Sequence, residues 1–314
     1  MYKRQEDGYA IISVKTYIKN VTDRIEKLLE VSLKKYGSPM EAGDHPEQDE
    51  TDLLPTSQIP IYQMLIGCAQ WAVTLGRFDI QYATNTLACH SCTPREGHLT
   101  RCMRLFGYLK YYKRAKIIMD PSPLNLDELK FEDHDWTDLY PNAQEHLPDT
   151  IPQTYNKEEM ILTVFMDASH ATCQMTRRSV TGYVIFLGNT PIKTYSKRQN
   201  TIETSSYGSE LVALRIALEG LLEIRYKLRM MGINFNETSP VLCDNMGVVT
   251  NMQFPTSSLK KKHNAVAYHK IREAVAAKII VLAHIRSEQN IAGILTKAVG
   301  PGTYYNLLGD ILFG

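Results

Sequence analysis

The sequence predicts an α/β fold: a mixed five-stranded sheet in the order βββαβαβα with helices on both faces, preceded by a mostly helical domain. Two short apolar, strand-like runs each end in an aspartate, Asp167 after residues 162–166 and Asp244 after residues 240–243. A long helical pattern lies between them, over residues 206–231. In open α/β sheets ligands bind at the carboxyl ends of the strands, so we expect the two aspartates to meet there.

Apolar residues at helical spacing predict helices over residues 59–88 and 96–116. We therefore expect a mostly helical first domain over residues 1–118. The next segment, residues 119–160, contains five of the fourteen prolines and has no sustained periodicity. Such a composition is typical of a linker.

The following domain, residues 161–300, is expected to contain the sheet, and residues 301–314 form a tail. Its elements are predicted from runs of β-branched and aromatic residues, from the turn at Gly188 and Asn189, and from helical spacing. In order they are strands over residues 161–167, 182–187 and 191–196, the helix over 206–231, a strand over 240–244, a short helix from Asn245, a helix over 264–277, a strand over 279–285 and a last helix from about Asn290. The first three strands are expected to form an antiparallel meander.

Two stripes run along the long helix, one of leucines and one of small residues that begins at Glu210 and continues through Ala213 and Ala217. Small residues allow close packing on the sheet, which would place Glu210 over the strand ends. Alternatively, Glu210 only complements the helix dipole in the first turn of the helix. The presence of Asp167 and Asp244 favours a metal site, because clusters of carboxylates select Mg²⁺ or Mn²⁺.

The net charge of +1 is distributed unevenly. Residues 1–118 carry 16 basic and 13 acidic residues, residues 119–160 carry 2 and 11, and residues 161–300 carry 17 and 9. A basic domain with a few acids at strand ends suits an enzyme that binds a polyanion and uses a metal ion. The alternative is an ordinary solvated surface.

The composition, with 44% hydrophobic and 22% charged residues, is ordinary for globular proteins, and 314 residues predict roughly two domains. No apolar run approaches the ~20 residues that span a bilayer, and the first residues do not resemble a signal peptide. The six cysteines are too scattered for a disulfide framework. We expect an intracellular protein, cytoplasmic or nuclear and not secreted, with reduced thiols and no membrane partner.

Eight motifs follow one another between Val164 and Lys297. They are Val164-Phe-Met-Asp-Ala-Ser-His, Arg177-Arg-Ser-Val-Thr-Gly-Tyr-Val-Ile-Phe-Leu, Tyr195-Ser-Lys-Arg-Gln-Asn-Thr-Ile-Glu-Thr-Ser-Ser, Gly208-Ser-Glu-Leu-Val-Ala-Leu, Cys243-Asp-Asn, Leu259-Lys-Lys-Lys-His, Tyr268-His-Lys-Ile-Arg-Glu and Asn290-Ile-Ala-Gly-Ile-Leu-Thr-Lys. Through them, residues 161–300 resemble the ribonuclease H domain of copia-type retrotransposon Pol polyproteins. Residues 62–71, 76–80, 94–99 and 106–110 are similar to the C-terminal part of the reverse transcriptase of the same family.

The resemblance implies a ribonuclease H-like fold and hydrolysis of the RNA strand of an RNA–DNA hybrid with two Mg²⁺ ions, or Mn²⁺. Three of the four acids that serve the family as metal ligands and catalytic groups correspond to Asp167, Glu210 and Asp244. The fourth belongs in the motif Asn-x-Ala-Asp-x-Leu-Thr-Lys, where this chain has Gly293. Because glycine has no oxygen ligand, we expect weakened activity. The alternative is a catalytically inactive, nucleic-acid-binding remnant of such a polyprotein.

The Tyr-x-Asp-Asp motif of polymerases occurs nowhere in the sequence, so we expect no polymerase activity. The hybrid would be recognised through its groove shape and 2′-hydroxyls and through its phosphates. The best candidates for phosphate contacts are Arg177, Arg178, Lys197, Arg198, Lys260, Lys261, Lys262 and His263. For residues 260–262 a solvated run of charges is the alternative. The acidic residues 121–150 could fold back on the basic face and compete with nucleic acid. The sequence leaves the oligomeric state open.

A third hypothesis is a small zinc-binding module. Cys89, Cys92, His98 and Cys102 approximate the ligand order of a zinc knuckle. The intervals between them hold two, five and three residues, which differ from those of the knuckle. The flanking residues also match the reverse-transcriptase pattern, so the nuclease hypothesis is favoured.

Overall fold

The computed structural model describes residues 2–4, 9–156, 158–259 and 264–313 of the chain. It contains two compact units, each assembled from separate stretches of the chain. The first comprises Met1–Met119, Ala171–Arg177 and Ile294–Gly314, and the second comprises Asp120–His170 and Arg178–Gly293. The domain boundaries expected from the sequence, at residues 118, 160 and 300, stay predictions.

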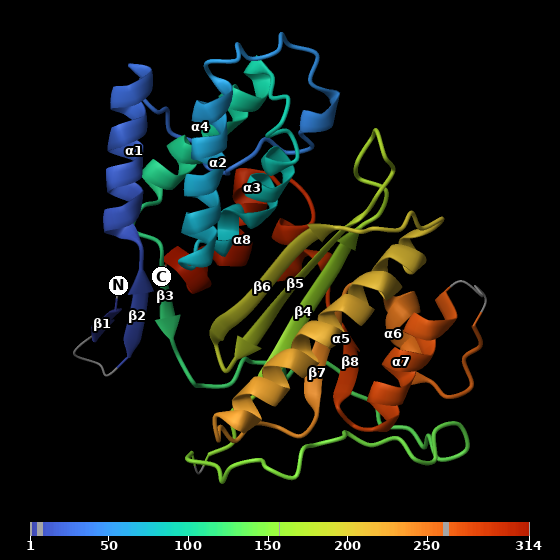
Figure 1. Cartoon of the computed structure of the whole chain (residues 1–314). Coiled ribbons are helices and arrows are strands. Elements are labelled where there is room, and N and C mark those ends of the chain that lie inside the picture. Colours follow the sequence, from blue (N-terminus) through green and yellow to red (C-terminus); the bar gives the residue numbers. More distant parts are fainter. Residues whose placement is uncertain (1, 5–8, 157, 260–263, 314) are drawn as a thin grey trace. The chain divides into compact units, whose positions relative to one another are not determined.

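The first unit combines helices with a small antiparallel sheet of strand order β1-β2-β3. Its strands are β1 (Tyr2–Arg4), β2 (Ala10–Ser13) and β3 (Lys116–Met119), and its α-helices are α1 (Lys15–Leu29), α2 (Ile59–Thr74), α3 (Gln81–Ala88), α4 (Glu96–Tyr111) and α8 (Pro301–Leu308) (Figure 1). The mostly helical character expected of this part of the chain is confirmed. The sheet was not expected, because β2 and β3 pair across about a hundred residues, as in the register of Ser13 with Lys116.

The single helix predicted over residues 59–88 is wrong, because the structure has two helices there, α2 and α3. Gly76 lies between them with φ of +110°, a conformation that residues with a Cβ rarely adopt. Its backbone N–H donates a hydrogen bond of 2.9 Å to the carbonyl oxygen of Val73, which ends α2. A short 3₁₀ turn at Phe78–Ile80 then leads into α3.

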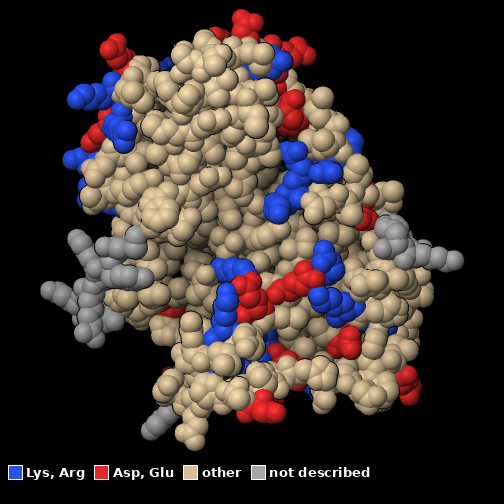
Figure 2. Space-filling view, viewed as in Figure 1, with Lys and Arg blue, Asp and Glu red and all other residues tan. Residues whose placement is uncertain are grey.

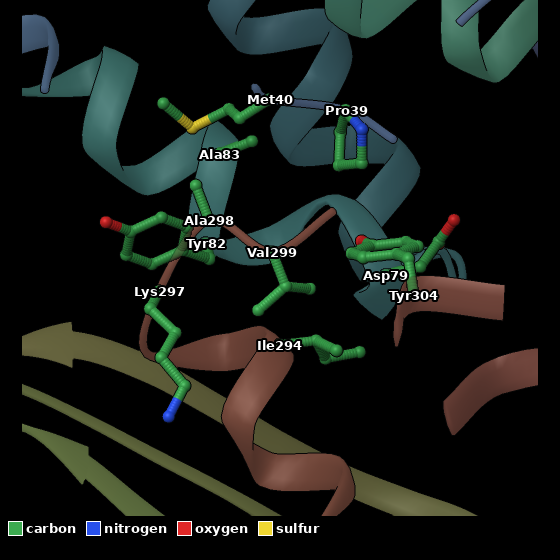
Figure 3. Close-up of a pocket in the computed structure, with 10 residues that line it drawn as sticks. All are labelled: Pro39, Met40, Asp79, Tyr82, Ala83, Ile294, Lys297, Ala298, Val299 and Tyr304. Atoms are coloured by element: carbon green, nitrogen blue, oxygen red, sulfur yellow. The ribbon is translucent and has the colours of Figure 1, made fainter. Parts of the chain in front are cut away.

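The last helix, predicted to start near Asn290, is a short 3₁₀ turn at Ile291–Leu295. The side-chain oxygen of Asn290 accepts a hydrogen bond of 3.2 Å from the backbone N–H of Ala292, and such local bonds compete with helix formation. The α-helix of this region, α8, starts later, with a proline at its first position. Tyr304 of α8 and Ile294 border a cavity of about 10 Å³ in the first unit (Figure 3), which has room for one water at most.

The second unit is built on a mixed sheet of five strands in the order β6-β5-β4-β7-β8 (Figure 1). Its strands are β4 (Leu162–Ser169), β5 (Val180–Leu187), β6 (Thr190–Arg198), β7 (Ser239–Cys243) and β8 (Ile280–His284), and its helices are α5 (Ser206–Met230), α6 (Met246–Gln253) and α7 (Ala265–Ala276). β4, β5 and β6 are antiparallel, whereas β7 is parallel to β4 and β8 to β7. This order confirms the predicted α/β class and ribonuclease H-like topology.

The long helix α5 packs on the sheet through the predicted stripe of small residues. Ala213 is fully buried, and a Cβ added at Gly220 would lie 2.3 Å from the hydroxyl oxygen of Tyr183 on β5. Alternate residues of β4, among them Met166 and Ala168, join the same core as α5, α6 and α7. One face of the sheet is thus covered by helices whose small residues allow close approach.

The outer face of α5 carries interleaved charges, visible as alternating blue and red patches over this helix in Figure 2. Arg215 pairs with Glu219, and Lys193 and Lys227 both pair with Glu223. Because these charges neutralise one another, the outer face of α5 is not a basic patch. α5 has 25 residues, yet no helix in the described part of the chain combines the length and apolar composition needed to cross a bilayer.

Residues 120–160, here called the strap, pack on the second unit although the described part of this segment forms no helix or extended strand. Trp136 of the strap is buried in the core of the unit, and the Arg272 guanidinium lies 4.7 Å from the centre of its ring. An irregular segment that contributes a large aromatic residue to a core is held in place by burial of apolar surface.

The strap also pairs with the C-terminal end of α5. The Glu145 carboxylate lies 2.8 Å from the Arg225 guanidinium and 2.6 Å from that of Arg229. Along a helix that rises 1.5 Å per residue, Arg225 is roughly 22 Å from Glu210. This acidic contact of the strap is therefore remote from the Glu210 end of α5, and competition of the strap with nucleic acid stays a prediction.

Candidate metal centre

Asp167 and Asp244 lie at the same end of two neighbouring parallel strands. Met166 of β4 is in register with Cys243 of β7, and each aspartate directly follows its member of this pair. Asp167 is buried within the last part of β4, whereas Asp244 follows the last residue of β7 and is half-buried. The register therefore places the two aspartates side by side at the carboxyl end of the sheet.

Glu210 reaches this end of the sheet from the start of α5. The side-chain oxygen of Ser205 caps the helix by accepting a hydrogen bond of 3.2 Å from the backbone N–H of Gly208. The cap fixes the direction of the first turns, and Glu210 is 5% exposed there. Glu210 is the fifth residue of α5, and no acidic residue lies in the first turn, to which the effect of the helix dipole is confined, so the alternative role considered for Glu210 is not supported.

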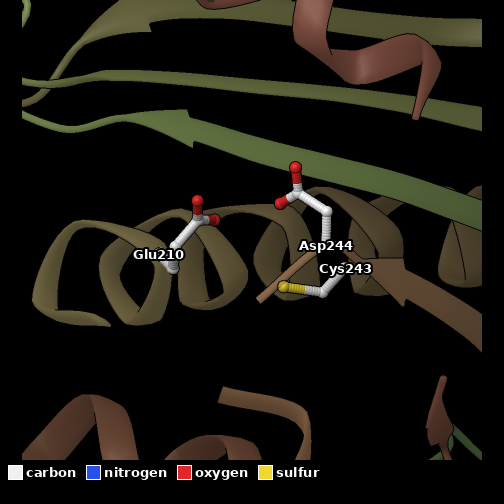
Figure 4. A group of neighbouring side chains, drawn as sticks. All are labelled: Glu210, Cys243 and Asp244. Carbon is white, nitrogen blue, oxygen red and sulfur yellow. The ribbon is translucent and has the colours of Figure 1, made fainter. Parts of the chain in front are cut away.

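Glu210, Cys243 and Asp244 form one group, in which one carboxylate oxygen of each acid and the Sγ atom all lie within 4.8 Å of one another (Figure 4). In the part of the chain that the structure describes, this is the one group of three or more potential metal ligands. Asp167 does not satisfy the same limit. Side chains alternate between the faces of a strand, and Met166 packs into the core below α5, so the next residue is directed toward the opposite face.

Cys243 is the member of this group that was missed from the sequence. Its thiol is fully buried, and burial, followed by the negative charges of Glu210, Asp244 and Asp167, raises the pKa of Cys243 well above its ordinary value. Asp167 is thus near enough for its charge to act on the thiol, although its carboxylate lies outside the group of three. The available signal was the position of Cys243 directly before Asp244 at the end of an apolar strand.

The turn that follows β7 is held by residues that follow β8. The Ser287 hydroxyl donates a hydrogen bond of 2.7 Å to Oδ2 of Asp244, and the backbone N–H of Ile285 donates one of 3.0 Å to the carbonyl oxygen of Cys243. Because both contacts act on adjacent residues, they restrict the orientation of the Asp244 carboxylate.

The segment that contains Gly293 lies beside the end of β4. The side-chain amide of Asn290 donates a hydrogen bond of 2.9 Å to the carbonyl oxygen of Met166. The backbone N–H of Gly293 donates a hydrogen bond of 3.0 Å to the carbonyl oxygen of Asn290. Gly293 is buried. The position that carries the fourth acid in the family motif is thus in the neighbourhood of Asp167, but it contributes no side-chain oxygen.

The donor atoms at this end of the sheet suit a hard divalent cation. The carboxylate oxygens of Asp167, Glu210 and Asp244 are the ligands that Mg²⁺ and Mn²⁺ prefer. Several negative charges at one partly buried place repel one another, and a divalent cation offsets that repulsion. The three acids therefore fit the metal implied by the resemblance, whereas the thiol of Cys243 is a softer donor.

Three of the basic residues expected to contact nucleic acid lie at the carboxyl end of β4. Ser169 of β4 is opposite Val180 of β5, which is opposite Arg198 of β6. With strands spaced by about 4.8 Å, Lys197 and Arg198 are roughly 10 Å across the sheet from the end of β4. Arg178 precedes β5 at the same end and is exposed.

The remaining basic candidates have other positions. Arg177 is exposed in the first unit, has a left-handed backbone with φ of +55°, and donates a hydrogen bond of 3.2 Å to the side-chain oxygen of Gln174. Lys260, Lys261, Lys262 and His263 lie outside the described residues.

The hypothesis of a zinc module gains no support. Nδ1 of His98 accepts a hydrogen bond of 2.9 Å from the backbone N–H of Arg95, and Nε2 lies 2.9 Å from the carbonyl oxygen of Pro46. Cys102 is buried in α4, where burial raises the pKa of its thiol to about 12. In the first unit, both ring nitrogens of His98 thus have hydrogen-bond partners, and Cys102 is part of the packed interior.

Curated relatives of this chain are retrovirus-related Pol polyproteins of plant transposons. The chain is 24% identical over 250 residues to that from transposon RE1 of Arabidopsis thaliana, which covers 80% of the chain and 15% of the relative. It is 24% identical over 248 residues to the polyprotein from transposon RE2 of the same plant, and this match covers 78% of the chain and 14% of the relative. The resemblance to retrotransposon Pol polyproteins is confirmed, and the chain spans about 15% of the length of the curated relatives it matches. No protein-family model matches the chain.

Solved structures with some likeness to the chain include ribonucleases H. LC11-RNase H1 in complex with an RNA/DNA hybrid is 22% identical, with a TM-score of 0.34, and the match covers 43% of this chain and 93% of that one. RNase H1 from Halobacterium salinarum NRC-1 is 13% identical, with a TM-score of 0.33. The match covers 48% of this chain and 98% of that one. The strand order of the sheet, rather than these likenesses, identifies the fold of the second unit.

Proposed function

We propose that the second unit is a retrotransposon-derived ribonuclease H-like domain, which uses Mg²⁺ to hydrolyse the RNA strand of an RNA–DNA hybrid and is weakened by Gly293. The observation that carries this proposal is the position of Asp167, Glu210 and Asp244 at one end of the sheet. Two acids come from adjacent parallel strands in register, and the third comes from the capped start of α5. The similarity to transposon Pol polyproteins supports the choice of a hybrid as substrate.

The side chains have distinct roles in this proposal. Asp167, Glu210 and Asp244 would hold the cation, and the hydrogen bond from Ser287 would orient Asp244. When bound, the cation would polarise the scissile phosphate and lower the pKa of a water molecule. The basic residues at the same end of the sheet, Arg178, Lys197 and Arg198, would bind phosphates of the hybrid.

Gly293 supports a second candidate function, a nucleic-acid-binding domain without catalysis. A glycine stands beside the end of β4 where the family motif has an acid, so one carboxylate of the site is missing. With three acids instead of four, binding of the second ion should be weaker, and cleavage should need higher concentrations of Mg²⁺ or Mn²⁺.

The two candidates can be separated with the full chain, a labelled RNA–DNA hybrid, and Mg²⁺ or Mn²⁺. We expect Asp167→Asn to abolish cleavage and Gly293→Asp to raise it roughly tenfold or more, because ligand-level changes alter metal affinity by such factors. Gly293→Asn is the matched control, since it adds a side chain of the same size without the charge, and it should not raise cleavage. Equal rates for the wild type and Gly293→Asp would contradict the role given to this position. Binding of the hybrid without cleavage by any variant would favour the second candidate.

A further inference from the structure

A sulfur atom lies among the carboxylates of the candidate metal centre. Figure 4 shows Sγ of Cys243 and the carboxylate of Asp244 on the side of Glu210, and their ligand atoms lie within 4.8 Å of one another. A site for Mg²⁺ alone has no use for such a donor, because Mg²⁺ prefers oxygen. As a mere core residue, Cys243 would only fill space below α5.

We propose that Glu210, Cys243 and Asp244 form a mixed sulfur and oxygen site for a thiophilic divalent cation such as Zn²⁺, which competes with Mg²⁺ for the same carboxylates. The site itself depends only on these three side chains. The competition with Mg²⁺ rests on the function proposed above.

The spacing of the three donors suits such an ion. Zn²⁺ binds sulfur at about 2.3 Å and carboxylate oxygen at about 2.0–2.2 Å, so ligand atoms around a tetrahedral ion are roughly 3.3–3.8 Å apart. Donors already within 4.8 Å need shifts of at most about 1–1.5 Å, which rotations of the Glu210 and Asp244 side chains can supply. Three protein ligands leave a fourth position for water, as in open zinc sites.

The fold places these donors on two separate elements. Glu210 comes from α5, while Cys243 ends β7 and Asp244 begins the turn after it. Because the strand ends at Cys243, the strict alternation of side chains does not apply to the next residue, and both can face one ion. The backbone of this turn is held by the hydrogen bond from Ile285, and the backbone N–H of Asn245 donates a hydrogen bond of 3.4 Å to the sulfur of Cys243.

The chemistry of the donors determines which cations compete. Sulfur ligands select Zn²⁺ and Cd²⁺ over Mg²⁺ and Mn²⁺, whereas the two carboxylates accept all four ions. Removal of the sulfur should therefore weaken binding of Zn²⁺ and Cd²⁺ while leaving oxygen ligands for Mg²⁺.

The test uses the full chain with the exposed thiols removed by Cys89→Ser and Cys92→Ser. CdCl₂ is titrated without substrate, and the ultraviolet charge-transfer band between thiolate and metal is recorded. We expect a band that saturates at one Cd²⁺ per chain, that Cys243→Ser removes, and that needs at least about tenfold more Cd²⁺ in Glu210→Gln, which keeps the sulfur. Cys243→Ala, which keeps a small apolar side chain in the core, should also lack the band, and circular dichroism checks that both variants are folded.

A band that persists in folded Cys243→Ser, or the absence of a saturable band in the parent protein, would overturn the proposal. Addition of MgCl₂ should raise the concentration of Cd²⁺ needed for half-saturation, and no effect at any concentration would refute the shared site. Where the chain cleaves a hybrid, ZnCl₂ should inhibit the parent at about tenfold lower concentration than Cys243→Ser. If no cleavage occurs, the proposed nuclease function fails while the Cd²⁺ band still decides the metal site.

Discussion

The contact of the strap with the C-terminal end of α5 leads to a prediction about stability. Burial alone would raise the pKa of Glu145, but hydrogen bonds from Arg229 and Arg225 outweigh it and lower the pKa from 4.5 to about 2. Glu223, on the exposed face of α5, also has its pKa lowered to about 2, by hydrogen bonds from Lys193 and Lys227. The two carboxylates differ in their surroundings, because the side chain of Glu145 is 19% exposed and that of Glu223 is 49% exposed.

The expected magnitudes follow from this difference. Lowering the pKa of Glu145 from 4.5 to about 2 corresponds to about 3 kcal/mol of interaction with the ionised carboxylate. Its partner Arg225 is 1% exposed and keeps three other acceptors, Ser239 Oγ and the carbonyl oxygens of Asn236 and Glu237. We therefore expect Glu145→Gln to lower the free energy of unfolding by about 2–3 kcal/mol, less than the largest losses seen for broken buried ion pairs. The exposed pairs of Glu223 are screened by solvent, so Glu223→Gln should cost less than about 1 kcal/mol.

Urea unfolding of the full chain, followed by circular dichroism, measures both variants. The pKa of Glu145 is lower in the folded than in the unfolded state, so its contribution is present above pH 4.5 and is lost as the pH falls toward 2. The stability of Glu145→Gln should accordingly depend less on pH than that of the wild type over this window. A loss for Glu145→Gln no larger than that for Glu223→Gln at pH 7 would refute the reasoning.

Other predictions concern packing, the strap and the nucleic-acid surface. Gly220→Ala places a Cβ 2.3 Å from a buried tyrosine hydroxyl and should cost roughly 1–3 kcal/mol in urea unfolding. Gly67→Ala, in a helix with no atom within 4 Å of the added Cβ, should be neutral or stabilising, and equal effects of the two would contradict the packing argument. Deletion of residues 121–150 removes the core tryptophan and should broaden and lower the thermal transition. In fluorescence anisotropy at low salt this deletion should tighten hybrid binding if the acidic strap competes with nucleic acid, and an unchanged affinity of a folded deletion variant would exclude that competition. The double variant Lys197→Glu and Arg198→Glu should weaken hybrid binding. The slope of log affinity against log salt concentration should become shallower by the amount expected for about two lost phosphate contacts, and an unchanged slope would exclude both residues from the interface.

The sequence by itself determined the element order of the second unit and the order of its acids. Every helix and strand predicted between residues 161 and 285 lies within two residues of the observed bounds. These signals are local, because apolar alternation, helical spacing and turn residues act over a few positions. Asp167, Glu210 and Asp244 could be chosen on the same basis, since each lies near the end of an element that the local pattern predicts.

Only the tertiary structure decided which side chains from different elements meet. The pairing of Glu145 with Arg225 spans 80 residues, and the burial of Trp136 turns an apparent linker into part of a core. Cys243 joined the acids for the same reason, because the register of β7 and the position of α5 bring its sulfur to Glu210. Contacts of this kind depend on packing between segments far apart in the chain, and no local pattern encodes them.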